Sequence, residues 1–293
     1  IKEIISRLES AGFEAFAVGG CVRDLLRGEK PKDWDITTNA KPEEIQRLFP
    51  DSFYENKFGT VGVKASDKKN LLNADIEADS SEIVEITTYR IESKYSDKRH
   101  PDEIKFASKI EDDLKRRDFT INALAMDKNG GVIDLFHGHS DFENKLIRAV
   151  GQAGERFEED ALRLLRAIRF AVQLDFEIEE KTLEAIKEKA GLIKVIAAER
   201  IRDELLKIIK WEAGNERWDM GKKTRRSNEV AEQELKRGPA RAFELMRETG
   251  LLKIILPEFE DGYEVGQNKH HVFSVWEHNL RAFTYAVKEN FNI

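Results

Sequence analysis

The first half of the chain alternates short apolar runs with charged segments, a pattern typical of mixed helices and strands. Residues 81–90 alternate strictly, with Val84 and Ile86 on the face opposite Glu85, so they predict a half-buried strand. Residues 1–12 carry apolar side chains at helical spacing up to Gly12. The remaining runs predict strands at 13–20, 34–39, 59–65 and 132–138, helices at 21–28 and 41–50, and a mobile polar loop at 91–103.

After about residue 150 the strand pattern is replaced by helical periods. These periods predict helices at 156–174, 180–193, 197–210 and 239–252. The predicted fold class is therefore α+β, with a head built on a mixed β-sheet followed by an all-helical remainder. The predicted domains are a head at 1–148, a helical segment at 149–210 and a second helical segment at 211–293. Within the last, the charged residues 211–237 are interpreted as a surface insertion or a polar helix pair.

The composition describes a charge-rich globular chain of 293 residues with a net charge of −7. An acidic balance argues weakly against a nucleic-acid binder and remains compatible with a local basic face. Cys21 is the only cysteine, which excludes an intrachain disulfide and is typical of the reducing cytoplasm. The sequence contains neither an apolar run of membrane-spanning length nor a secretory signal, so we expect a cytoplasmic protein. Because the chain begins at Ile1, we expect the true N-terminus to lie upstream.

Candidate chemistry is concentrated in residues 15–39. Asp33 and Asp35 are two residues apart around a predicted strand, so their carboxylates point to one face. Such a pair suits Mg²⁺, which binds one or two carboxylates together with substrate phosphates, and Glu85 is a candidate third acid. The alternative is a pair of ordinary surface acids, which is the better interpretation of an Asp-x-Asp motif taken alone.

The two glycines upstream of this pair change that balance. Gly19 and Gly20 end an apolar run at a predicted strand-to-helix turn, where backbone N–H groups can face an anion. Arg23, in the helix that follows, can bind a phosphate through two nitrogens. The sequence after Val18 does not match the G-x-G-x-x-G pattern of dinucleotide binding. The combination favours a phosphate-bearing substrate held with a metal ion.

Three motifs in this order resemble the bacterial and eukaryotic-type (class II) tRNA nucleotidyltransferases, the CCA-adding enzymes of the poly(A) polymerase superfamily. The resemblance covers residues 13–210 closely and extends more loosely to the end of the chain. The motifs are GGCVRDLLRG at 19–28 with DWDITT at 33–38, DDLKRRDFTINALAMD at 112–127, and EDALRLLRAIRF at 159–170.

The resemblance implies roles for each motif in the head. Asp33 and Asp35 would hold two Mg²⁺ ions, with Glu85 as a further catalytic acid. The triphosphate would be bound by Gly19, Gly20 and Arg23, and the ribose would be recognised by Arg117, Asp118 and Asn122. Without the resemblance, residues 116–123 are better interpreted as a charged helix start followed by a buried stretch.

The third motif implies a protein template for the incoming base. Asp160 and Arg163 are expected on one face of a single helix, three residues apart, next to Glu159. Their polar edges would match the Watson–Crick edges of cytosine and adenine, whereas the structural alternative is an ordinary salt bridge within the helix. Arg166 is expected to contact a phosphate or to be structural.

Two further segments bear on which activity is present. Residues 90–101 resemble the flexible loop retained by enzymes that add the terminal A, which argues against a CC-only enzyme; its recognisable positions are Arg90, Tyr95, Asp97 and Arg99. Residues 270–279 resemble the opening of an HD-type domain, but Ser274 stands where relatives often carry Asp. We therefore expect no HD phosphohydrolase activity and a structural role for His270, His271 and His278. We also expect much of the tRNA-gripping tail of relatives to be missing.

The resemblance implies an enzyme that adds CCA, or its last A, to tRNA 3′ ends from CTP and ATP, with Mg²⁺ as cofactor and pyrophosphate as product. Its expected partners are therefore tRNA, CTP and ATP, and no membrane. The alternatives on the same scaffold are an enzyme that adds A only and a bacterial poly(A) polymerase. The alternative from another class is a non-catalytic RNA-binding module, against which the intact Asp33-x-Asp35 pair argues.

Overall fold

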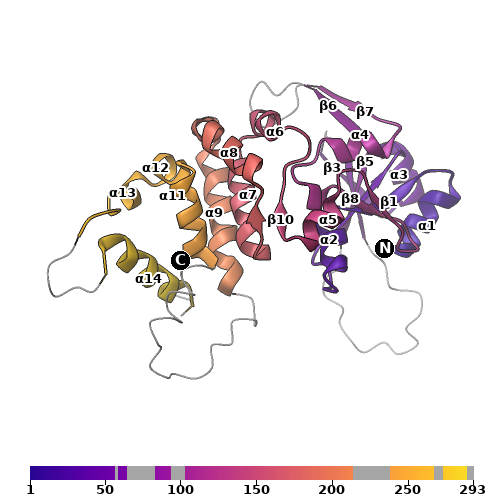
Figure 1. The fold of residues 1–293 in the computed structure, drawn as a ribbon. Helices are drawn as coiled ribbons and strands as arrows, with labels where there is room; N and C mark the ends of the chain where they lie inside the picture. Colours follow the sequence, from indigo (N-terminus) through magenta and orange to yellow (C-terminus); the bar gives the residue numbers. More distant parts are fainter. Residues whose placement is uncertain (57–58, 65–82, 94–102, 214–237, 267–272, 289–293) are drawn as a thin grey trace, which may run out of the picture. The chain divides into compact units, whose positions relative to one another are not determined.

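A computed structural model describes residues 1–56, 59–64, 83–93, 103–213, 238–266 and 273–288 (Figure 1). Two compact units make up this chain. The head unit comprises the described residues up to Glu143, and the helical unit comprises those from Asn144 onward. The predicted boundaries at 148 and 210 stay predictions, and most of the expected insertion, 214–237, lies outside the described residues.

The head unit is built on one seven-stranded mixed sheet. β2 and β5 run parallel, and the other neighbouring pairs are antiparallel. This sheet confirms the predicted α+β class. In sheet order the strands are β3 (Ser52–Asn56), β4 (Thr60–Lys64), β5 (Ile83–Thr88), β2 (Trp34–Thr38), β1 (Ala15–Val18), β8 (Leu124–Met126) and β9 (Val132–Asp134).

Helices cover both faces of this sheet. One face packs α1 (Lys2–Ser10), α2 (Gly20–Leu26) and α3 (Pro42–Leu48) against the buried side chains of alternate strand positions. The opposite face packs α4 (Ile110–Lys115), and Val18 and Ala125 belong to that second cluster. Because Trp34 and Ile36 lie in the first cluster, Asp35 and Thr37 project from β2 toward the α4 side. The polar site residues therefore share one face of the sheet.

The five predicted strands are confirmed as β1, β2, β4, β5 and β9, with closer bounds. In β5, residues 84, 86 and 88 are buried, as the alternation predicted. β3 and β8 were not predicted from the sequence. β8 has only three residues inside a continuous apolar stretch, which is too short to show any period.

The prediction of a loop over 91–103 is wrong at both of its ends. β6 (Arg90–Ser93) pairs with β7 (Glu103–Phe106) in an antiparallel hairpin. A two-stranded ladder is held by backbone hydrogen bonds, which require no apolar alternation. Ile91 and Phe106 accordingly remain exposed. The intervening residues, 94–102, lie outside the described part of the chain.

The helical unit is built almost entirely of helices, and α7 packs against both α9 and α11. Its described helices are α6 (Ala153–Glu159), α7 (Arg163–Leu174), α8 (Glu180–Lys189), η2 (Ala190–Val195), α9 (Ala198–Ala213), α11 (Gly238–Glu248), α12 (Leu251–Ile255), α13 (Pro257–Glu260) and α14 (Val275–Lys288). One exception corrects the all-helical prediction, because β10 (Leu146–Ile147) pairs in parallel with β11 (Glu177–Ile178). Throughout the described residues, no helix is long and apolar enough to cross a membrane.

The predicted helix at 156–174 is wrong as a single element, because it is interrupted at Asp160. The backbone of Asp160 is extended (φ −137°, ψ 104°), and its Oδ1 accepts a hydrogen bond from the N–H of Leu162 at 3.1 Å. An aspartate side chain that bonds to the backbone two residues ahead competes with the helical hydrogen bond. α6 therefore ends at Glu159, and α7 begins at Arg163.

Substitution at Gly138 is expected to destabilise the head. A Cβ on Gly138, the first residue of α5 (Gly138–Glu143), would lie 2.1 Å from the carbonyl oxygen of Thr120 in η1 (Thr120–Asn122). Gly138→Ala should lower the free energy of unfolding by about 1–3 kcal/mol, as overpacking does, measured by urea denaturation. The control is Gly191→Ala in η2, where a Cβ meets nothing within 4 Å. Equal stability of the two variants would contradict this expectation.

Candidate active site

The turn from β1 into α2 is the centre of the candidate site. Gly19 has a left-handed backbone (φ +80°), and its N–H donates to the carbonyl of Leu124 in β8 at 3.2 Å. A Cβ there would lie 2.9 Å from Nη1 of Arg117 and 3.8 Å from Oδ2 of Asp35. Both the left-handed backbone and the limited space for a side chain therefore require glycine at position 19. The Arg117 guanidinium and the Asp35 carboxylate both lie beside it.

The predicted phosphate and ribose residues are brought together in one hydrogen-bond chain. Nη1 of Arg23 donates to Oδ1 of Asn122 at 2.9 Å, although the two residues are 99 positions apart. Nδ2 of Asn122 donates to Oδ1 of Asp118 at 3.1 Å, and the backbone N–H of Phe119 donates to the same oxygen at 2.8 Å. Asp118 and Asn122 are both buried. Gly20, the next residue of this turn, is the first residue of α2.

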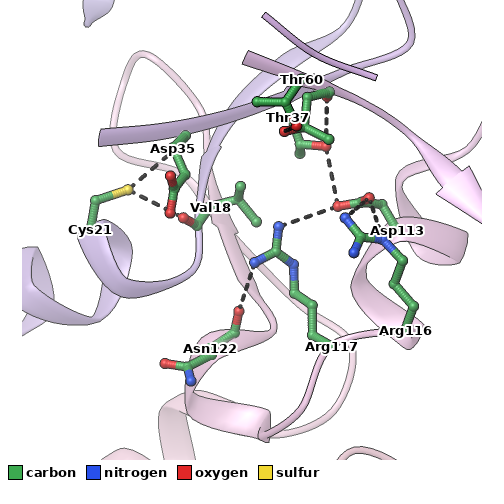
Figure 2. Close-up of polar contacts among 10 residues, drawn as sticks. Val18, Cys21, Asp35, Thr37, Thr60, Asp113, Arg116, Arg117 and Asn122 are labelled. Atoms are coloured by element: carbon green, nitrogen blue, oxygen red, sulfur yellow. Dashed lines mark hydrogen bonds and ion pairs between the residues drawn. The ribbon is translucent and has the colours of Figure 1, made fainter. Parts of the chain in front are cut away.

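Arg117 lies between Asn122 and Asp113, and its guanidinium contacts both residues (Figure 2). Its Nη1 donates to the carbonyl of Asn122 at 3.4 Å, and its Nη2 donates to Oδ2 of Asp113 at 3.3 Å. Its Nε is buried without a hydrogen-bond partner in the described part of the chain. Two long bonds and one unused donor leave the guanidinium with capacity for an anionic oxygen.

Two of the three predicted acids, Asp35 and Glu85, lie on neighbouring strands of the sheet, and Asp33 directly precedes β2. Glu85 on β5 is the register partner of Asp35 on β2, so both side chains share one face. Burial raises the pKa of Asp35; the Arg117 guanidinium opposes this shift, and the nearby Asp33 carboxylate adds to it. The described residues contain no group of three or more acidic, histidine or cysteine side chains arranged to hold a metal ion. The Asp33–Asp35 pair stays the predicted metal donor set, and a pair would leave further coordination positions to substrate oxygens.

Cys21 ties the first turn of α2 to the strands on either side. Its Sγ donates to the carbonyl of Val18 at 3.3 Å and lies 3.7 Å from the carbonyl of Asp35 (Figure 2). The thiol is buried, and burial raises its pKa. It therefore remains a neutral donor that anchors the turn, rather than a reactive thiolate.

Sequence reasoning missed Asp113, a carboxylate with no exposed surface in α4. It accepts hydrogen bonds from Thr37, Arg116 and Arg117 (Figure 2). The signal was present, because Asp113 occupies the buried stripe of α4 together with Ile110 and Leu114. An acidic residue at an apolar position of an amphipathic helix indicates a buried ionic partner.

The residues of the expected base template are partnered differently from the expectation. Asp160 and Arg163 were expected on one face of a single helix, but the helix is interrupted at Asp160 and resumes at Arg163. Nη1 of Arg163 donates to Oε2 of Glu159 at 2.7 Å and to the carbonyl of Arg156 at 3.2 Å. Oδ2 of Asp160 instead accepts from Nη2 of Arg200 in α9 at 2.9 Å. Each template residue is thus held by a separate partner.

The remaining predicted residues fall in several places. Arg166 in α7 is partly exposed, with its guanidinium carbon 5.2 Å from the centre of the Phe170 ring. Arg90 begins the hairpin strand β6, whereas Tyr95, Asp97 and Arg99 lie outside the described residues, as do His270 and His271. Ser274 caps α14, because its hydroxyl accepts from the N–H of Glu277 at 3.1 Å, and His278 in that helix is exposed.

Two known families match parts of the chain, one in the head unit and one in the helical unit. Residues 15–148 match the family described as the poly A polymerase head domain. Residues 175–216 match the family described as the probable RNA- and SrmB-binding site of polymerase A.

Curated proteins similar to the chain include several CCA-adding enzymes. The chain is 50% identical over 206 residues to the CCA-adding enzyme of Lactobacillus helveticus, and the aligned region covers 70% of this chain and 48% of the relative. It is 48% identical over 207 residues to that of Enterococcus faecalis, with 70% and 48% coverage. The chain thus spans about half the length of the curated relatives it matches.

Solved structures agree with this assignment. The crystal structure of the Bacillus stearothermophilus CCA-adding enzyme in complex with CTP has a TM-score of 0.65 and 35% identity, covering 85% of this chain and 51% of that one. A tRNA nucleotidyltransferase complexed with a primer tRNA and an incoming ATP analogue has a TM-score of 0.61 and 25% identity, with 91% and 64% coverage.

The stability of the chain is expected to depend on the ionisation of Asp113. Burial alone raises the pKa of this carboxyl, but Arg116, Arg117 and the hydrogen bonds from Arg116 and Thr37 outweigh it, so the pKa is lowered. A lowered folded-state pKa contributes stability that is complete above the unfolded value of about 3.9 and is lost as pH falls toward the folded value. Asp113→Asn should therefore lower the urea midpoint most near neutral pH, and the gap to the wild-type chain should narrow below about pH 4.

The control for this titration is Glu111→Gln, an exposed acid on the same helix. It should follow the wild-type midpoint at every pH. If the difference in urea midpoint between Asp113→Asn and the wild-type chain stayed constant down to pH 3, the stabilising role of ionised Asp113 would be contradicted.

Proposed function

We propose that this chain, which belongs to the poly(A) polymerase superfamily of tRNA nucleotidyltransferases, adds CCA, or its terminal A, to tRNA 3′ ends from CTP and ATP. The observation that carries the proposal is the convergence of the Asp35 carboxylate and the Arg117 guanidinium beside Gly19, which joins a metal-type carboxylate to a phosphate-type donor. We also propose the cytoplasm as its location, where the buried Cys21 thiol remains reduced.

Nucleotidyl transfer in this family uses a divalent metal ion, and we propose Mg²⁺, held by Asp33 and Asp35. The residues fit such an ion. Burial and the neighbouring Asp33 carboxylate raise the pKa of Asp35, which means that the pair carries a repulsion that a cation would relieve. When bound, Mg²⁺ would polarise the 3′-hydroxyl of tRNA and neutralise the leaving pyrophosphate.

In this proposal the chain's own residues bind and orient the nucleotide. Arg23 and Arg117 contact the triphosphate oxygens, and Asp118 and Asn122 hold the ribose. The 3′-oxygen of tRNA forms a bond to the α-phosphorus while the bond from that phosphorus to pyrophosphate breaks. Glu85, on the same face as Asp35, completes the acidic environment of the transferred group. Positioning and electrostatic stabilisation supply most of the catalysis in phosphoryl and nucleotidyl transfer.

The base is read, in this proposal, by Asp160 and Arg163, with Glu159 as the partner that holds Arg163. The fixed fork of a guanidinium and the two oxygens of a carboxylate offer donors and acceptors to a Watson–Crick edge. Arg200 and Glu159 orient these side chains before a nucleotide arrives. Such preorganisation lowers the cost of ordering the template on binding.

A poly(A) polymerase is a second candidate, because the family matched by residues 15–148 is described by that activity. The identity of about 50% to CCA-adding enzymes favours CCA addition. An enzyme that adds only the terminal A is a third candidate on the same scaffold. The site residues retained in the head favour all three over a non-catalytic RNA-binding module.

The proposal is tested by single-nucleotide extension with Mg²⁺. Three tRNAs, ending before CCA, after C and after CC, are each offered CTP, ATP or both. Ordered addition of C, C and A that then stops supports CCA addition. Extension of the CC-ended tRNA alone indicates an A-adding enzyme, whereas long A tails indicate a poly(A) polymerase. An absence of extension on all three tRNAs contradicts the proposed function of this chain.

Neutralising Asp35 is expected to remove the metal-dependent step. Asp35→Asn should lower the rate of extension by at least about a hundredfold, because the loss of a charged ligand weakens Mg²⁺ binding. The rate is measured under single-turnover conditions across a range of Mg²⁺ concentrations. Glu43→Gln, an exposed acid in α3, serves as control and should extend at the wild-type rate. Unchanged activity of Asp35→Asn would show that this carboxylate is not a metal ligand.

Changing Asp160 is expected to alter the choice of base rather than RNA affinity. Asp160→Ala removes the carboxylate while Arg163 keeps its bond to Glu159, so the ratio of CTP to ATP incorporation should fall or rise by about tenfold. Competition between the two nucleotides on the CC-ended tRNA measures this ratio. Glu184→Gln in α8 is a control acid of the helical unit. A changed tRNA affinity with an unchanged ratio would contradict the template role.

A further inference from the structure

Among the described residues of the head, Asp113 is a fully buried carboxylate to which the proposed reaction assigns no role. It has no exposed surface and lies in α4 between Ile110 and Leu114 on the buried side of the helix. Burying a carboxylate is costly unless ionic and hydrogen-bond partners compensate for its lost hydration. An apolar side chain at this position would avoid that cost, so the role of the Asp113 carboxylate must be sought in the groups that it contacts.

Both oxygens of this carboxylate accept hydrogen bonds, from three residues in two segments of the chain. Oδ1 accepts from Nε and Nη2 of Arg116, at 2.9 and 2.7 Å. Oδ2 accepts from the hydroxyl of Thr37 at 3.1 Å and from Nη2 of Arg117 at 3.3 Å. Four donors saturate the carboxylate, so it acts through its partners rather than by touching a substrate or a metal ion.

The contact with Arg117 fixes the direction of that guanidinium. Nη2 is bound by Asp113, and Nη1 is bound by the carbonyl of Asn122, so the planar group is held at two points. The same Nη1 lies 2.9 Å from where a Cβ on Gly19 would stand. Figure 2 shows both contacts. Without Asp113, the guanidinium would lose the bond at Nη2 and keep the bond from Nη1 to Asn122, so it could rotate away from the turn at Gly19.

The contact with Thr37 couples this arginine to the strand that carries the acidic pair. Thr37 follows Asp35 by two residues on the same face of β2, and its side chain is fully buried. One carboxylate thereby sets the position of the cationic group against the strand that presents the anionic group. Placement errors of about 1 Å in such a site are costly for catalysis.

We propose that Asp113 is a positioning residue that holds Arg117 against the incoming nucleotide's phosphates, aligned with β2 through Thr37. This inference rests on the proposed nucleotide site. The competing explanation is structural: Arg116 makes the shorter bonds, and Asp113 would then serve only to bind Arg116 and stabilise α4. The two explanations differ in whether nucleotide affinity depends on Asp113 through Arg117.

The test is a double-mutant cycle on CTP binding, measured by isothermal titration calorimetry with the full chain and Mg²⁺. Asp113→Asn should raise the Kd for CTP by about tenfold, because the charge-assisted bond to Arg117 is lost. In an Arg117→Ala background, the same change should alter Kd by less than about twofold, because its mediator is already absent. Glu111→Gln on the same helix is the matched control and should bind CTP like the wild-type chain.

A second variant covers the case in which Asp113→Asn does not fold. Thr37→Val is close to isosteric and removes one bond to Oδ2 of Asp113, so it should raise the Kd for CTP by about threefold. Thermal unfolding is recorded for every variant. An unchanged Kd in Asp113→Asn with a lowered Tm would overturn the proposal in favour of the structural explanation. Additive effects in the cycle, or a wild-type Kd in Thr37→Val when Asp113→Asn cannot be folded, would overturn it as well.

Failure of this inference and failure of the proposed function give different results. A wild-type chain that binds CTP but extends no tRNA would overturn the proposed function, while the cycle would still report on Asp113. A wild-type chain that binds neither CTP nor ATP would overturn both. Wild-type extension that accompanies an unchanged Kd in Asp113→Asn would overturn the positioning role alone.

Discussion

The register between β1 and β2 is the constraint on which the site depends. These strands are antiparallel with Ala17 opposite Ile36, so β1 ends beside the beginning of β2. The chain leaves β1 at Gly19 next to Asp35, and the left-handed glycine directs it into α2. A slip of one residue would turn Asp35 and Thr37 into the apolar face that α1, α2 and α3 cover. The buried residues of that face, including Ile36 and Ala17, oppose such a slip.

Two carboxylates on the α4 side of the sheet illustrate how the head separates structural from chemical charge. The pKa of Asp113 is lowered, because two guanidiniums and a hydroxyl more than compensate its burial. The pKa of Asp35 is raised, because burial and the Asp33 carboxylate outweigh the influence of Arg117. The charge of Asp113 is therefore balanced by partners within the protein, whereas an added cation would stabilise the ionised form of Asp35. Arg117 contributes to both balances, which makes it the electrostatic link between them.

The helical unit separates charges by a different device. Asp160 interrupts the helix by bonding to the backbone of Leu162, and this break gives Asp160 and Arg163 different neighbours. Arg163 is buried against Glu159 in the preceding helix, whereas Asp160 is paired with Arg200 on α9. A continuous helix would have placed the two side chains three residues apart on one face, where they neutralise each other. The interruption keeps both groups separately oriented.

The sequence by itself determined the mixed sheet of the head, the helical remainder and the residues around Gly19, because alternation, helical periods and glycine pairs are local signals that survive without tertiary contacts. It also placed Asp35 and Glu85 on strands, although their adjacency in parallel register is a non-local pairing. Only the tertiary structure decided that Arg23 meets Asn122, that Asp113 holds Arg117, and that Asp160 pairs with Arg200. The hairpin of β6 with β7 and the three residues of β8 also escaped prediction, since backbone pairing leaves no period in so few side chains. Long-range ionic partners carry no local pattern, because the charge of a side chain is visible in the sequence and its neighbour in the fold is not.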